Sequence, residues 1–106
     1  MMVSRIQLLL AACALASAPT HAADVAAGKA KAEEVCADCH GDDGKGDDES
    51  PDIVKLTQKE FVTAMQEFQS GKRNDPDKMA QKMVRESKKL SAAEIANLAA
   101  YYQTLK

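Results

Sequence analysis

Apolar residues recur at the three- and four-residue spacing of amphipathic helices in four stretches of the 106-residue chain. These stretches cover residues 24–36, 57–70, 75–86 and 91–105. No stretch shows the strict alternation that is typical of a half-buried strand, and no internal repeat or second domain is visible. The pattern therefore predicts an all-α domain of about four helices.

Residues that favour helix ends bound these stretches. Residues 57–60 (TQKE) and 91–94 (SAAE) are capping boxes, Asp24 is a candidate N-cap, and Asp75-Pro76 predicts an N-cap followed by proline at the first helical position. Gly28 inside the first helix predicts that another helix crosses closely there, the alternative being a glycine tolerated near a helix start. The expected core faces carry Val25, Gly28, Ala32 and Val35 in the first helix, Phe61, Met65 and Phe68 in the second, and Ile95, Leu98, Ala99, Tyr102 and Leu105 in the last.

The first 22 residues have the pattern of an export signal. A short, weakly positive segment precedes an apolar run over residues 6–16, which is too short to span a bilayer. Small residues at Thr20 and Ala22 then predict cleavage after Ala22, with cleavage after Ala23 as the near alternative. We therefore expect a signal peptide over 1–22, a mature domain over 23–106 and a periplasmic location.

Cys13 lies inside this leader, where its ordinary role is a small apolar residue. The sequence Leu10-Ala11-Ala12-Cys13 also fits a lipobox. Cleavage before Cys13 would leave a lipidated protein tethered to the membrane, and this is the one way in which we expect contact with a membrane.

Chemistry is concentrated in Cys36-Ala37-Asp38-Cys39-His40, because C-x-x-C-H is the signature of covalent haem attachment. The two thiols add to the haem vinyl groups, and the histidine binds the iron. A zinc site would need about four protein ligands, whereas the mature chain offers two cysteines and one histidine. A thioredoxin-like pair would follow a strand of a βαβ unit, and no such strand is predicted. The motif predicts one covalently attached haem c.

The stretch 41–51 is a loop by composition, and its acidic residues lack the spacing of a calcium loop. We expect it to wrap the haem edge. The carbonyl of Pro51 at its end is a candidate acceptor for the second ring N–H of His40, which would fix the tautomer of the ligand.

Three methionines of the mature chain could bind the other face of the iron: Met65, Met79 and Met83. Met65 lies on the expected core face of its helix, where a flexible apolar side chain is the ordinary occupant. Met79 and Met83 are one helical turn apart, and the periodicity does not separate them.

The mature chain resembles the class I c-type cytochromes, in particular a single domain of cytochrome c4 or the cytochrome subunit of flavocytochrome c sulfide dehydrogenase. The resemblance implies the small class I fold around one haem. It also implies that Met83 is the axial methionine, that Gly28 meets the last helix against Tyr101 or Tyr102, and that Pro51 accepts the hydrogen bond from His40. The matching residues are Gly28, Cys36, Cys39, His40, Gly41, Asp43, Gly44, Pro51, Phe68, Gly71, Arg73, Met79, Met83, Leu90, Ser91, Glu94, Ile95, Leu98, Ala99 and Tyr101.

Two positions depart from the pattern of this family. An aromatic residue is frequent where this chain has Ala32, and a Gly-Gln pair is frequent where it has Leu56-Thr57. These differences bear on packing and leave the haem-attachment motif intact.

Charge is unevenly distributed along the chain, whose net charge is −2. Residues 33–52 are strongly acidic, and residues 72–89 are mainly basic. The net charge and the absence of an interleaved aromatic and basic pattern argue against nucleic acid as a partner. We expect redox proteins as partners, docking through the basic 72–89 segment.

The function predicted from these features is one-electron transfer by a haem with histidine and methionine ligands, without enzymatic activity of its own. Saturated ligation leaves no position on the iron for a substrate. The alternatives are a haem subunit of a larger oxidoreductase, such as a sulfur-compound dehydrogenase, and a gas-binding sensor or haem enzyme with no methionine on the iron.

Overall fold

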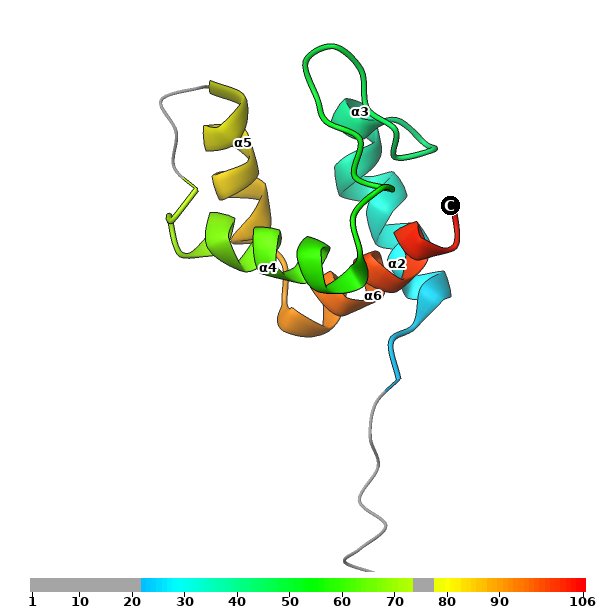
Figure 1. Ribbon diagram of the computed structural model, residues 1–106. Helices are drawn as coiled ribbons and strands as arrows, with labels where there is room; N and C mark the ends of the chain where they lie inside the picture. The colour runs from blue at the N-terminus through cyan, green and yellow to red at the C-terminus, as the bar shows by residue number, and fades with distance from the viewer. Residues whose placement is uncertain (1–21, 74–77) are drawn as a thin grey trace, which may run out of the picture.

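The structure is a computed structural model that describes residues 22–73 and 78–106, and within these ranges it is helical with no strand (Figure 1). The predicted all-α architecture is confirmed. The elements are α2 (Val25–Lys31), the π-helical turn η1 (Ala32–Cys36), α3 (Ala37–His40), α4 (Gln58–Gln69), α5 (Lys78–Ser87) and α6 (Ala92–Gln103). The first three follow one another without a break, so the first predicted helix extends four residues beyond Cys36, as far as His40.

The predicted caps start three of the helices. Asp24 accepts a hydrogen bond from the amide of Ala27 at 3.0 Å. Thr57 and Ser91 each form a complete capping box with the glutamate three residues on. The predicted start of the third helix at Asp75-Pro76 lies outside the described residues. Local sequence therefore sets where α2, α4 and α6 begin.

Helices α2 and α6 cross at Gly28, as the sequence predicted. A Cβ atom added to Gly28 would lie 2.1 Å from the carbonyl oxygen of Asn97 and 2.9 Å from the Cβ of Tyr101. Any larger residue would push the helices apart. The prediction that Val25 shares the buried face is wrong, since its side chain is 41% exposed. The contact is centred at Gly28, which leaves the first turn of α2 at its edge.

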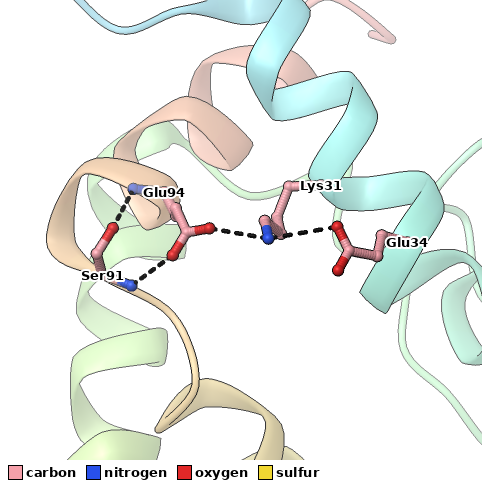
Figure 2. A network of polar contacts seen from close by, with 4 residues as sticks. All are labelled: Lys31, Glu34, Ser91 and Glu94. Carbon is pink, nitrogen blue, oxygen red and sulfur yellow. Dashed lines mark hydrogen bonds and ion pairs between the residues drawn. The ribbon is translucent and has the colours of Figure 1, made fainter.

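A polar network joins the same two helices (Figure 2). The Nζ atom of Lys31 lies 2.9 Å from a carboxylate oxygen of Glu94 and 3.3 Å from one of Glu34. The other carboxylate oxygen of Glu94 accepts the amide N–H of Ser91 at 2.9 Å. The Ser91 amide, and after it the Lys31 ammonium, lower the pKa of Glu94 to about 2.

The core is built around α6, which packs against α2 and α4, while α5 packs mainly against α4. Two aromatic pairs fill it, Phe61 with Tyr102 and Tyr101 with Tyr102, at ring-centre distances of 5.8 and 5.3 Å. Helices α3 and α5 stand apart above α4 and α6 (Figure 1). The buried apolar residues are Ala32, Val54, Phe61, Met65, Leu90, Ile95, Leu98, Ala99, Tyr101 and Tyr102.

Across residues 22–73 and 78–106, no helix combines the length and apolar character needed to cross a membrane.

Candidate haem-binding site

A cavity of about 650 Å³ opens between α3, α4 and α5. This volume is in the range of small-molecule and cofactor sites, about 300–1,000 Å³. The structure brings all five residues predicted for the site to its lining: Cys36, Cys39, His40, Pro51 and Met83. Further apolar residues complete the lining, among them Ile53, Leu56, Phe61, Met65, Phe68 and Leu90.

His40 is the last residue of α3 and is buried, with 7% of its surface exposed. Its Nδ1 lies 3.0 Å from the carbonyl oxygen of Pro51, so this ring nitrogen carries the proton and donates. The expected hydrogen bond is therefore present. It leaves the lone pair of Nε2 free for a metal, and a hydrogen-bonded second nitrogen is the usual arrangement for a histidine ligand.

Gly46 packs directly against the carbonyl of Pro51, a contact that could not be predicted from the sequence. Its φ is +72°, and an added Cβ would lie 2.1 Å from the carbonyl oxygen of Ser50 and 2.5 Å from that of Pro51. Its amide donates to the carbonyl of His40 at 2.8 Å. The loop thus returns on itself so tightly that glycine is required here. The sequence shows three glycines in this loop, Gly41, Gly44 and Gly46, but only the fold shows that Gly46 is the one that contacts Pro51.

Asp47 closes the turn that leads to Pro51. Its carboxylate accepts the amides of Glu49 and Ser50 at 2.9 Å each, and its own amide donates to the carbonyl of Ser50. These backbone hydrogen bonds lower the pKa of Asp47. The acidic loop is therefore an ordered support for the histidine side of the cavity.

Cys36 and Cys39 are partly buried at the junction of η1 and α3 and are not joined by a disulfide. Burial raises the pKa of the Cys36 thiol, with the nearby Tyr102 acting in the opposite direction. A thiol–disulfide catalyst needs a lowered thiol pKa, so the environment disfavours that alternative. Among the described residues, no group of three or more histidine, cysteine or carboxylate side chains is placed to hold a metal ion.

Two methionines with described side chains line the cavity. Met65 projects from α4 and is 5% exposed, within the core, as its place on the apolar face predicted. Met83 projects from α5 and is only partly buried. The side chain of Met79, the alternative axial ligand, lies outside the described part of the chain. Opposed helices α3 and α5 thus bring His40 and Met83 to one cavity.

The sequence of residues 25–106 matches the family model of cytochrome c. The chain belongs to this family and is a class I c-type cytochrome, with a covalently bound haem c. It is 34% identical over 91 residues to cytochrome c-554(547) of Halothiobacillus neapolitanus, a match that covers 80% of this chain and all of that protein. Members of the family are typically electron carriers that pass electrons to redox partners, and class I members are usually exported to the periplasm.

The residues of the cavity fit this cofactor. The cavity is of cofactor size and mainly apolar, and it is lined by two thiols with two residues between them and by an imidazole whose Nδ1 is already hydrogen-bonded. A thioether side chain is available on the opposite helix. The donor set therefore agrees with the chemistry that the family implies.

Proposed function

We propose that this protein is an exported one-electron carrier. In this proposal Cys36 and Cys39 attach the haem, and His40 and Met83 bind its iron. The proposal rests on one observation: His40 and Met83 line the same cavity, and Nδ1 of His40 donates a hydrogen bond to the carbonyl of Pro51. When bound, the haem supplies an iron that alternates between the ferric and ferrous states. With His40 and Met83 both bound to the iron, no ligand position would remain for a substrate, so we propose a carrier and not an enzyme.

The residues around the cavity serve this function by keeping the surroundings of the iron the same in both oxidation states. The hydrogen bond from Nδ1 of His40 fixes the orientation of the imidazole and raises its basicity. A thioether ligand favours ferrous iron and raises the potential. Apolar residues such as Phe61, Phe68 and Leu90 keep water away from the cavity.

Spectroscopy of the purified holoprotein tests the proposed ligands. The ferric protein should show a near-infrared sulfur-to-iron charge-transfer band, and the ferrous protein should bind CO slowly. M83A should remove the band and speed CO binding, whereas M65L, which keeps an apolar side chain at the core position, should change neither. A wild-type protein without the band, or with rapid CO binding, would instead indicate a gas-binding or catalytic haem protein.

We propose that acidic redox partners dock on the basic 72–89 segment. Three of its residues, Arg73, Lys82 and Lys89, line the cavity, and the Nζ atom of Lys82 lies 3.4 Å from the sulfur of Cys39. Arg73 and Lys89 are paired with Glu67 and Glu86, so Lys82 is the side chain that we expect to draw an acidic partner toward the haem edge.

The proposed export rests on the signal pattern over 1–22, which lies almost wholly outside the described residues, and on the family match, which begins at residue 25. Intact-mass spectrometry of the holoprotein from a periplasmic extract tests it. The expected mass is that of Ala23–Lys106 plus one haem. A mass that retains residues 14–22 and a lipid on Cys13 would indicate membrane attachment.

A further inference from the structure

Helix α5 carries Met83, and the way it is held bears directly on that residue. Among the described elements α5 packs mainly against α4. Its last residue, Ser87, is fully buried, with 0% of its surface exposed. The C-terminal end of α5 is therefore fixed in the interior of the protein.

Gln69, the last residue of α4, contacts this end directly. Its Nε2 donates to the carbonyl oxygen of Ser87 at 2.8 Å and to that of Leu90 at 3.0 Å. An amide NH₂ group has two protons, so both bonds can form at once. The carbonyl of Ser87 also accepts the amide of Leu90 at 3.1 Å, so Gln69 binds the turn at the end of α5 at both of its ends.

The two residues whose carbonyls accept these bonds, Ser87 and Leu90, are both connected to the cavity. Ser87 is one helical turn after Met83, so these residues share a face of α5. Leu90 is itself part of the cavity lining. A shift of the end of α5 relative to α4 would therefore move Met83 relative to the cavity.

We propose that Gln69 is a positioning residue for Met83, holding the methionine side of the site closed by fixing the end of α5 to α4. The inference rests on the proposed ligation by Met83 and adds a residue outside the haem-attachment motif and outside the cavity lining. Because Gln69 does not line the cavity, it would act through the main chain at the end of α5.

The test compares Q69L with a matched variant, Q103L. Gln103 also donates its Nε2 to the main-chain carbonyl of a residue of the cavity lining, Leu56, at 2.9 Å, but this bond joins α6 to the segment before α4 and does not involve α5 or the turn that follows it. Leucine keeps much of the side-chain volume and removes the donors in both cases. The readouts are the ferric charge-transfer band and the rate of CO binding to the ferrous holoprotein, at a temperature where far-ultraviolet circular dichroism shows both variants folded.

Q69L should bind CO roughly tenfold faster than wild type and lose the band at lower temperature, because two hydrogen bonds that hold α5 are gone. Q103L should stay within about twofold of wild type in CO binding even where its melting temperature falls by a similar amount. If Q69L does not fold, Q69E, which keeps the length and polarity but lacks the donors, replaces it with the same expected result.

The outcomes separate this inference from the proposed function. A band that persists in M83A overturns ligation by Met83, and with it the role of Gln69. A band lost in M83A, together with equal CO-binding rates in Q69L and Q103L, overturns only the positioning role of Gln69.

Discussion

The hydrogen bonds that orient His40 in the histidine wall of the cavity, formed by α3 and residues 41–51, join residues close in sequence. The methionine wall, formed by α5, is bonded at its end by Gln69 from a more distant part of the chain. His40 bonds to Pro51 eleven residues away, and Gly46 and Asp47 order the loop between them. Gln69 reaches Ser87 and Leu90 across 18 and 21 residues. A local perturbation of the packing should therefore release the methionine side before the histidine side.

The largest effect is expected from preventing attachment of the haem, which would fill the cavity between the two walls. C36A/C39A prevents covalent attachment and leaves the cavity unfilled. The apolar side chains that line this cavity of about 650 Å³ then lose the packing partner that the haem supplies, and a small domain has only about 5–15 kcal/mol of stability to lose. We expect the haem-free variant to be largely disordered by circular dichroism. A cooperative thermal transition near that of the holoprotein would contradict this.

G46A should damage the histidine wall selectively, with G71A as the matched control. Both glycines have positive φ, +72° and +78°, but among the described residues no heavy atom lies within 4 Å of a Cβ built on Gly71. Backbone strain should cost each variant roughly 1 kcal/mol, and the clash with Pro51 should cost G46A about 1–3 kcal/mol more.

Redox titration separates the two glycine variants further. In G46A the displaced Pro51 carbonyl weakens the bond from His40, lowers the basicity of the ligand and should raise the reduction potential. G71A should leave the potential unchanged. Equal potentials in G46A and wild type would show that the loop does not act on His40.

Acid should weaken the contact between α2 and α6, which lies beneath the histidine wall. The hydrogen bonds of Gln69 on the methionine side join an amide to carbonyl groups, so they should not depend on pH. The pKa of Glu94 is about 2 in the folded protein against 4.5 for a free side chain. Its contribution to stability is therefore complete above about pH 4.5 and is lost as the pH falls toward 2. E94Q should flatten the dependence of melting temperature on pH in this range. E33Q, at an exposed position of η1, should keep the wild-type slope, and identical slopes in E94Q and wild type would count against the network.

The smallest effect concerns the charge at the mouth between the walls. Oxidation of the ferrous protein by ferricyanide, an anion, should be about two- to fivefold slower in K82E than in wild type at low salt, and the difference should vanish at high salt. K29E changes the net charge equally on an exposed position of α2, away from the cavity lining. A similar loss of rate in K29E would point to net charge alone and not to the basic segment.

The capping boxes at Thr57 and Ser91 are encoded by neighbouring residues, and both could be predicted and are present. The crossing at Gly28 joins distant residues and was predicted from a glycine inside a helix, with the last helix as its partner implied by the family resemblance. The roles of Gly46 and Gln69 could not be predicted, because each depends on which backbone atoms the fold places next to them. The exposure of Val25 could not be predicted for the same reason. Periodicity shows which residues share a face of α2, but it does not show how far along that face the contact with α6 extends.

Methionine ligation by α5 is the central claim, and the ferrous protein labelled with ¹³C-methyl methionine tests it most directly. An axial methionine methyl group lies over the porphyrin ring in the diamagnetic state and resonates far upfield. We predict one such resonance, absent in M83L and retained in M79L and M65L. Its survival in M83L, or its absence from the wild-type protein, would contradict the account.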